Sequence, residues 1–188
     1  MKFSHKKKFI LVYTFVFLLL FLAFYFDNQI VILVSHIRNS LLNSFFVLIS
    51  SDILIFIAFL SLTILFIKEN KRKWILPMWL TLALSELIGF LLKITAQRQR
   101  PFQLGLVSII GAMENGFSFP SLHAMLIFSV IPFLSKENKK LRYVWIVFAC
   151  LVVFSRIYLG VHFLSDVIAG ALIGYTLGYF IVRSVEKR

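Results

Sequence analysis

Residues 155–166 read SRIYLGVHFLSD, and they separate two apolar runs at 143–159 and 164–182. Each run is long enough to cross a hydrocarbon core, which needs about 17 to 25 residues as a helix. Arg156, His162 and Asp166 follow one another at spacings of six and four. A charge at membrane depth costs about 2.5 kcal/mol or more, so ionisable residues there indicate a functional site. The flanking runs therefore indicate the fold class, and the polar residues between them the function.

The whole chain shows the same apolar character. Of its 188 residues, 60% are hydrophobic and 15% charged, which excludes a soluble globular domain and a disordered tail. The composition predicts an all-α, polytopic membrane protein with a single domain over residues 1–188. The predicted transmembrane helices are six, at about 9–26, 51–67, 74–92, 121–135, 143–159 and 164–182.

The segment 28–50 is apolar enough to suggest a seventh span. Its polar residues Ser35, His36, Asn39 and Asn43 recur near the helical period, which favours an amphipathic helix in the membrane interface. A seventh span would also place two basic clusters on the outer side, against the positive-inside rule. Six spans with an amphipathic interfacial helix after the first is therefore the predicted layout.

The basic residues predict the orientation. Fifteen of the 20 Lys and Arg residues lie in four clusters, at 2–8, 68–73, 136–142 and 183–188. Clusters between apolar spans are typical of cytoplasmic connections, so both termini are predicted to be cytoplasmic, in a multi-pass protein of the cell membrane. The net charge of +12 is then explained without nucleic acid, and the clusters are expected to touch anionic lipids.

Two further features concern architecture. The N-terminal run lacks a small-residue cleavage site and predicts an uncleaved signal anchor. In the last span Gly170, Gly174 and Gly178 are spaced by four, which predicts a face for close helix packing. The single Cys150 excludes an internal disulfide.

Three polar stretches are predicted to meet on the outer, extracytoplasmic face. KITAQRQRP at 93–101 leaves the third span, FSFPSLHA at 117–124 opens the fourth, and 155–166 joins the last two. Four of the five Lys and Arg residues outside the basic clusters lie in the first and third of these stretches. The predicted layout rests on the other 15 Lys and Arg residues and on the spans alone. The gathering of the three stretches on one face is therefore independent support for it.

The residue types in these stretches indicate a phosphate site. Lys93, Arg100 and Arg156 supply positive charge, and arginine presents a planar fork that fits phosphate oxygens. Ser121 stands at a predicted helix start, where its hydroxyl and the following N–H groups, including that of Leu122, can bind an anion. We expect these five residues to hold a phosphate group.

The same stretches contain two histidines suited to catalysis. His162 and Asp166 share one helix face if the last helix begins by residue 162, and the carboxylate would then orient the imidazole as a nucleophile. His123 remains as a general acid toward the leaving oxygen. The outer carboxylates are scattered along the chain, whereas magnesium or a two-metal site needs several together. We therefore predict metal-independent turnover without a cofactor.

Together the stretches resemble the signature of the type 2 phosphatidic acid phosphatase superfamily, K-x6-R-P, P-S-G-H and S-R-x5-H-x3-D. This chain has Lys93…Arg100-Pro101, Pro120-Ser121-Leu122-His123 and Ser155-Arg156…His162…Asp166, so the motifs lie within 93–166. The resemblance implies a helical bundle that hydrolyses lipid phosphates or diphosphates through a phosphohistidine.

The resemblance also implies roles for individual residues. His162 attacks phosphorus and is oriented by Asp166, while His123 protonates the leaving oxygen. The phosphate oxygens are held by the cations and by the helix start that carries Ser121. Leu122 replaces the usual glycine, and its side chain is expected to take space beside the phosphate.

The expected partners are a lipid phosphate substrate and membrane lipids, with no nucleic acid and no obligatory protein partner evident. Candidate substrates are undecaprenyl diphosphate, phosphatidylglycerophosphate, phosphatidic acid and a lipid A phosphate. Two alternatives stay open: a non-catalytic lipid-binding or transport protein, and a phosphotransferase.

Four charged residues have less defined expectations. Arg98 is expected to contact lipid headgroups, and Asp52 and Glu114 to be wetted loop residues. Glu86 lies within the third span, where it either pairs with a buried base or is held protonated.

Overall fold

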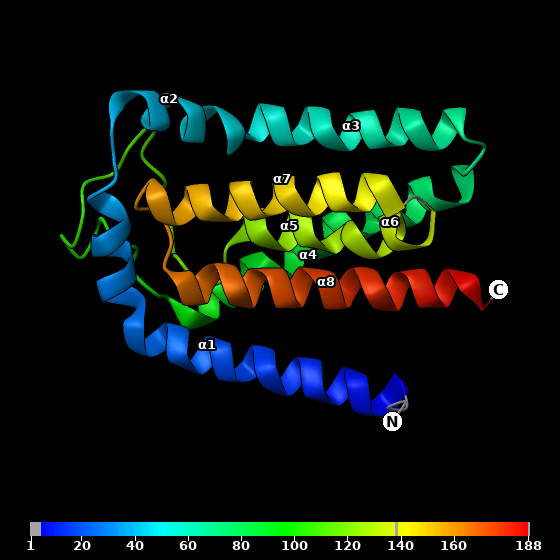
Figure 1. Ribbon diagram of the computed structural model, residues 1–188, viewed down its shortest axis with the longest axis horizontal. Helices are drawn as coiled ribbons and strands as arrows, with labels where there is room; N and C mark the ends of the chain where they lie inside the picture. Colours follow the sequence, from blue (N-terminus) through cyan, green and yellow to red (C-terminus); the bar gives the residue numbers. More distant parts are fainter. Residues whose placement is uncertain (1–4, 138, 188) are drawn as a thin grey trace.

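The computed structural model describes residues 5–137 and 139–187, and its regular structure in these ranges is helical (Figure 1). The N-terminal basic cluster and those at 136–142 and 183–188 fall partly outside these ranges. The helices are α1 (His5–Ser35), α2 (Ser40–Ile49), α3 (Asp52–Lys68), the short 3₁₀ turn η1 (Arg72–Trp74), α4 (Ile75–Ala96), α5 (Leu122–Ser129), α6 (Ile131–Glu137), α7 (Lys139–Tyr158) and α8 (Leu164–Glu186).

The long helices run side by side, and the connections separate into two groups at opposite ends (Figure 1). The start of α1, the end of α8 and the turn between α3 and η1 lie at one end. The connections 36–39, 97–121 and 159–163 lie at the other. The three polar stretches are therefore brought to one end of the bundle, as predicted.

The predicted count of six spans is not confirmed. Among the described residues, four helices are long and apolar enough to cross a membrane: Tyr13–Ser35, Arg72–Ala96, Lys139–Tyr158 and Leu164–Glu186. A fifth is added if α2 and α3, bent by 47° at their junction, form one broken span. The predicted span that is missing from this count is 121–135, because its helical part, Leu122–Leu134, is shorter than the other spans.

That segment is interrupted because of Pro132. Proline has no N–H to donate to the carbonyl four residues earlier, here that of Phe128. The N–H of Phe133 reaches the carbonyl of Val130, three residues earlier, while the N–H of Leu134 makes the ordinary four-residue bond to the same carbonyl. α5 ends at Ser129 and α6 begins at Ile131. The interrupted segment is tolerated because it lies inside the bundle, where Val130, Phe133 and Leu134 are fully buried.

The glycine face of α8 packs directly on α5, as predicted. A Cβ added at Gly170 would lie 2.5 Å from the carbonyl oxygen of Ser121, and at Gly174 2.0 Å from that of Met125. Only glycine lets the two backbones approach this closely. This contact sets the start of α5 beside the start of α8, where two of the polar stretches meet.

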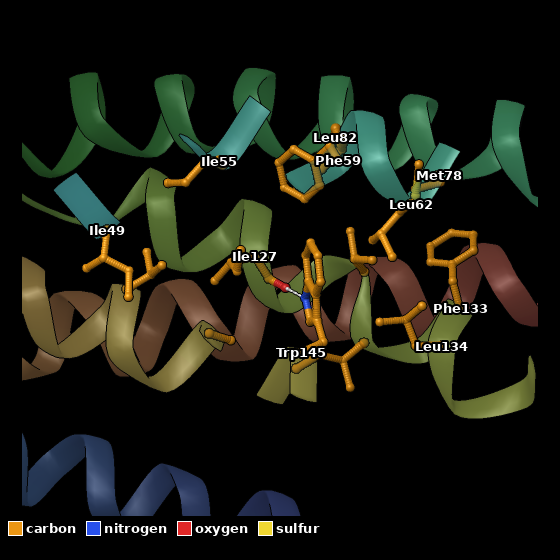
Figure 2. Close-up of a cluster of buried hydrophobic side chains, with 14 of the residues drawn as sticks. Ile49, Ile55, Phe59, Leu62, Met78, Leu82, Ile127, Phe133, Leu134 and Trp145 are labelled. Atoms are coloured by element: carbon orange, nitrogen blue, oxygen red, sulfur yellow. Dashed lines mark hydrogen bonds between the residues drawn. The ribbon is translucent and has the colours of Figure 1, made fainter. Parts of the chain in front are cut away.

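The apolar core lies between α3, α4, α5, α6 and α7 (Figure 2). Trp145 of α7 is central: its Nε1–H donates to the carbonyl of Ile127 at 2.8 Å, and its ring centroid lies 5.7 Å from that of Phe59 on α3. Outward-facing side chains are also large and apolar, including Phe21 and Ile53, each more than 70% exposed. Such surfaces suit contact with lipid.

The predicted amphipathic helix over 28–50 is wrong in its bounds. Residues 28–35 continue α1, and only Ser40–Ile49 forms a separate helix, α2. Residues 36–39 separate the two helices. α2 starts after Asn39 because the Oδ1 of Asn39 caps it by accepting the N–H of Leu42 at 3.0 Å. Phe46 of α2 then packs on Tyr158 of α7, with ring centroids 4.6 Å apart.

Candidate active site

His162 lies at the centre of the polar end, in the connection between α7 and α8. Its side chain is buried, and its backbone N–H donates to the carbonyl of Arg156 at 3.1 Å. Nε2 lies 3.3 Å from Nη1 of Arg100. Because a guanidinium only donates, Nε2 must present its lone pair, and the ring proton of the neutral imidazole sits on Nδ1.

Asp166 lies behind this ring, in the first turn of α8. Its Oδ2 is 3.5 Å from His162 Nδ1 and accepts the backbone N–H of Phe163 at 2.8 Å. The Ser118 hydroxyl donates to the same oxygen. The predicted pairing of His162 with Asp166 is present, but the helical start by residue 162 on which it was based is wrong. α8 begins at Leu164, and the preceding turn brings the ring to the carboxylate.

Burial lowers the pKa of His162 well below its usual 6.5, even though the hydrogen bond to Asp166 and its charge raise it. Arg100 and Arg156 lower it further. The imidazole is consequently neutral at physiological pH, as a nucleophile must be.

The predicted cationic phosphate ligands lie near this ring: Lys93 and Arg100 line the same cavity as His162, and Arg156 is linked to Arg100 through Glu114. Arg100 is buried, donates to the carbonyl of Val161 at 2.9 Å, and has a pKa lowered by burial to about 10, so it stays charged at neutral pH. Arg156 is buried at the end of α7, and its Nε has no hydrogen-bond partner among the described residues. Lys93 Nζ donates to the carbonyl of Phe117 at 2.5 Å.

The start of α5 adds two more predicted residues. Ser121 is fully buried, and its Oγ has no hydrogen-bond partner among the described residues; its backbone N–H donates to the carbonyl of Asp166 at 3.1 Å. Leu122 reaches across to α4, where a Cβ added at Gly89 would lie 2.2 Å from Leu122 Cδ2. The absent side chain at Gly89 thus makes room for the leucine that replaces the family glycine.

His123 faces the site from the next position of α5. Its Nε2 lies 3.0 Å from the carbonyl of Ser50 and 3.2 Å from Oδ1 of Asp52. Both oxygens accept, so Nε2 carries a proton. Asp52 was expected to be only a wetted loop residue; the structure pairs it with this histidine.

Glu114 was also expected to be a wetted loop residue, and this expectation is wrong. Its Oε2 lies 2.8 Å from Arg100 Nη1, and its Oε1 pairs with Nη2 of Arg156. The carboxylate therefore takes a place between the two guanidinium groups where an anion fits.

A cavity of about 790 Å³ opens in front of His162. Its polar end includes Lys93, Arg100, Glu114 and His123. Away from these it runs between α3, α4 and α5 along apolar side chains, namely Ile55, Phe56, Phe59, Trp79, Leu82, Ala83 and Leu126. Glu86, two turns before Lys93 on α4, also lines this cavity. The shape suits an amphiphile with an anionic head.

Several site residues have no signal in the sequence. Ser118, Asp52, Glu114, Asp27 and Arg98 all contact predicted site residues or their partners. Ser118 and Arg98 could have been suspected from their places, because they lie within the quoted stretches 117–124 and 93–101. Among the described residues, no group of three or more His, Cys, Asp or Glu side chains is arranged to hold a metal ion.

The fold and site define a helical membrane protein with an oriented histidine beside a cluster of cations. A sequence model of the PAP2 superfamily matches residues 74–188. The chain belongs to this superfamily, and that range contains every predicted site residue.

Individual relatives agree with this assignment. Phosphatidylglycerophosphatase B of Bacillus subtilis (strain 168) is 37% identical over 124 residues, which cover 60% of this chain and 58% of that protein. The alignment thus spans less than two thirds of that relative. Undecaprenyl-diphosphatase BcrC of the same organism is 28% identical over 78% of this chain and 76% of its own length.

The fold has a solved counterpart in a transmembrane PAP2 type phosphatidylglycerolphosphate phosphatase from Bacillus subtilis. The two chains are 27% identical and superpose with a TM-score of 0.72, over 93% of this chain and 95% of the other. The helical arrangement is therefore assigned to the PAP2 fold.

Proposed function

We propose that this protein is an integral-membrane lipid phosphate phosphatase that works through a phosphohistidine at His162. The observation that carries the proposal is the state of that ring. Nε2 offers a lone pair toward the cavity, Nδ1 faces the Asp166 carboxylate, and Arg100 stands 3.3 Å from Nε2.

In the first step Nε2 of His162 attacks phosphorus. A P–N bond forms and the P–O bond to the leaving lipid oxygen breaks. That oxygen takes the Nε2 proton of His123, which must enter this step as an imidazolium, protonated on both nitrogens, and leaves it as a neutral imidazole. Asp166 stabilises the positive charge that develops on the His162 ring. Lys93, Arg100, Arg156, Ser121 and the Leu122 N–H hold the phosphoryl oxygens, and a phosphate bound between the two arginines displaces the Glu114 carboxylate.

In the second step His123, now neutral, takes a proton from water as it attacks phosphorus. The P–N bond breaks, inorganic phosphate leaves, and both histidines return to their starting states. Charge neutralisation comes from the guanidinium and ammonium groups, so turnover is expected without a metal or another cofactor.

The substrate is proposed to be an amphiphile whose phosphate or diphosphate head lies at the polar end of the cavity. The apolar lining between α3 and α4 receives its chains. Undecaprenyl diphosphate, phosphatidylglycerophosphate, phosphatidic acid and a lipid A phosphate all meet this requirement, and the relatives named above act on heads of the first two kinds.

The protein is proposed to lie in the cell membrane with both termini cytoplasmic and the site on the extracytoplasmic face. A cysteine placed at Gln99 or at Asn70, in a Cys150→Ser background, tests this arrangement. The first is expected to react with an impermeant thiol reagent from outside, and the second from inside. Labelling of both from one side would contradict the topology.

The decisive experiment measures phosphate release by the purified protein in detergent containing EDTA. The four lipids form the panel, His162→Ala is the test variant, and His36→Ala, an exposed histidine outside the site, is the matched control. Release that persists in EDTA and in the control but disappears in His162→Ala supports the proposal.

Three other outcomes would contradict it. Release that EDTA abolishes would indicate a metal-dependent reaction. Loss of lipid phosphate without inorganic phosphate would indicate transfer to another acceptor. Absence of turnover on every lipid by folded protein would favour a binding or transport role.

A further inference from the structure

A buried charge network lies behind Asp166, on the side away from His162. Arg98, in the connection after α4, donates through Nη1 to Asp166 Oδ1 at 2.7 Å and to Ser165 Oγ at 2.6 Å. Its Nη2 donates to Asp27 Oδ2 at 2.8 Å. The sequence suggested a headgroup contact for Arg98, whereas the structure binds it to two carboxylates.

Asp27 of α1 anchors this network from outside the range that matches the family model. Its side chain is almost fully buried. Oδ1 accepts the backbone N–H of Ser165 at 2.9 Å, and Oδ2 accepts the Ser165 hydroxyl at 2.5 Å as well as Arg98. A buried carboxylate with three donors is fully satisfied, so α1 is fastened to the start of α8 beside Asp166.

The network assigns different partners to the two oxygens of Asp166. Oδ1 accepts Arg98, and Oδ2 faces His162, Ser118 and the N–H of Phe163. Asp166 is fully buried, and burial without a cation would favour its neutral form. A protonated carboxyl would compete with the Nδ1–H of His162 instead of accepting it.

The position of Arg98 separates it from the phosphate ligands. Its guanidinium lies 4.1 Å from the ring centroid of Phe163 and 5.2 Å from that of Phe24. It does not line the cavity in front of His162. Arg98 therefore acts on the Asp166 carboxylate and not on the cavity.

We propose that Arg98 is a positioning residue for the reaction: it keeps Asp166 ionised with Oδ2 directed at His162, and Asp27 of α1 holds Arg98 in place. This inference rests on the proposed phosphohistidine function. It adds α1 to the elements that the chemistry requires and distinguishes Arg98 from its neighbour Arg100, which faces the cavity.

The test compares Arg98→Met, Arg98→Lys and Asp27→Asn with Arg38→Met. Arg38 is a matched control because it comes from a connection at the same end and donates to backbone carbonyls, those of Tyr158 and Ser108. The readouts are kcat, inhibition by orthovanadate as a phosphate analogue, the pH profile, and thermal stability in detergent.

Arg98→Met is expected to lower kcat by about 10- to 100-fold, the usual effect of losing a group that orients a functional histidine. Orthovanadate inhibition should be unchanged, because no phosphate ligand is lost. Arg98→Lys should recover part of the activity. Asp27→Asn should lower kcat less, and the double variant with Arg98→Met should be no worse than Arg98→Met alone.

The acid limb of kcat/KM should move to higher pH in Arg98→Met and not in Arg38→Met, because Asp166 then takes up a proton more easily. The charged and titratable groups around Asp166 are Asp27, Lys93, Arg98, Arg100, Arg156 and His162. Arg98→Met removes one of these groups, whereas Arg38→Met leaves all of them in place.

Several outcomes would overturn the proposal. Weakened orthovanadate inhibition in proportion to the loss of activity would make Arg98 a phosphate ligand. An unchanged kcat in Arg98→Met would also contradict the proposal. So would a loss of activity and stability equal to that of Arg38→Met with an unmoved acid limb, because Arg98 would then have only a structural role. If Arg98→Met does not fold, Arg98→Lys and Asp27→Asn give the same readouts. A wild type inactive on every lipid would instead refute the proposed function itself.

Discussion

The two sides of the His162 ring are built differently. In front, the cations face a cavity, and buried polar atoms such as Arg156 Nε and Ser121 Oγ have no hydrogen-bond partner among the described residues. Behind, Asp166 and Asp27 receive donors on both of their oxygens. The front keeps donors that a phosphate can use, whereas in the rear both oxygens of each carboxylate already accept hydrogen bonds. This difference indicates that binding and orientation depend on separate residues.

The largest expected effect tests the rear. Asp166→Asn keeps the shape of the side chain but removes the charge that stabilises the His162 ring as it becomes positive. We expect kcat to fall by about 10³- to 10⁴-fold, as for other oriented histidines, with orthovanadate inhibition nearly unchanged. Steady-state kinetics on the best lipid would check this. An equal loss in orthovanadate affinity would show that the two sides are not separable.

A smaller effect with the opposite signature is expected from the front. Arg156→Met removes a donor that faces the bound phosphoryl group, so kcat/KM should fall by about 100-fold. Here orthovanadate inhibition should weaken as well. Unaltered inhibition would mean that Arg156 serves Glu114 or the fold and not the anion.

The pH dependence of phosphoenzyme formation tests the protonation state of the His162 ring, which lies between the two sides. The neutral form of His162 is the nucleophile, and its pKa in the folded protein lies well below 6.5 because of burial. Phosphoenzyme formation in a single turnover should therefore not decline as the pH falls from neutral to 6.5, and should be lost only at lower pH. A midpoint at or above 6.5 would contradict a desolvated ring.

The smallest effect concerns the edge of the front, where Leu122 meets Gly89. Gly89→Ala places a methyl group against Leu122 Cδ2 and should destabilise the protein by about 1–3 kcal/mol, the usual cost of overpacking. Leu122→Gly should relieve this loss in the double variant and widen the range of accepted lipids. Thermal unfolding in detergent measures the first effect and the lipid panel the second. Additive losses would show that the two residues do not share one space.

The sequence alone supports much of the fold and of the front of the site. Apolar runs indicate a helical membrane protein, and the spacing of Gly170, Gly174 and Gly178 predicts a face for close helix packing, although not that α5 is its partner. The eight predicted site residues lie together in the structure. These features can be predicted from the sequence because helix period and motif spacing are properties of short segments.

Other features depend on contacts between distant segments. The interruption at Pro132 changes a predicted span into α5 and α6, and is tolerated because neighbouring helices bury it. The bounds of α1 and α2 differ from the prediction because Asn39 caps a new helix after α1 has extended to Ser35.

The rear of the site was decided by tertiary structure in the same way. Arg98 and Asp27 are 71 residues apart, and Asp27 and Ser165 are 138 apart. No local period or spacing records such pairs, so Asp27 resembled any polar residue near the end of a span. The sequence by itself determined the family, the membrane class and the residues proposed to face phosphate. Only the packing of α1 against α8 decided which groups hold Asp166, because a buried carboxylate takes its partners from whichever segments the fold brings beside it.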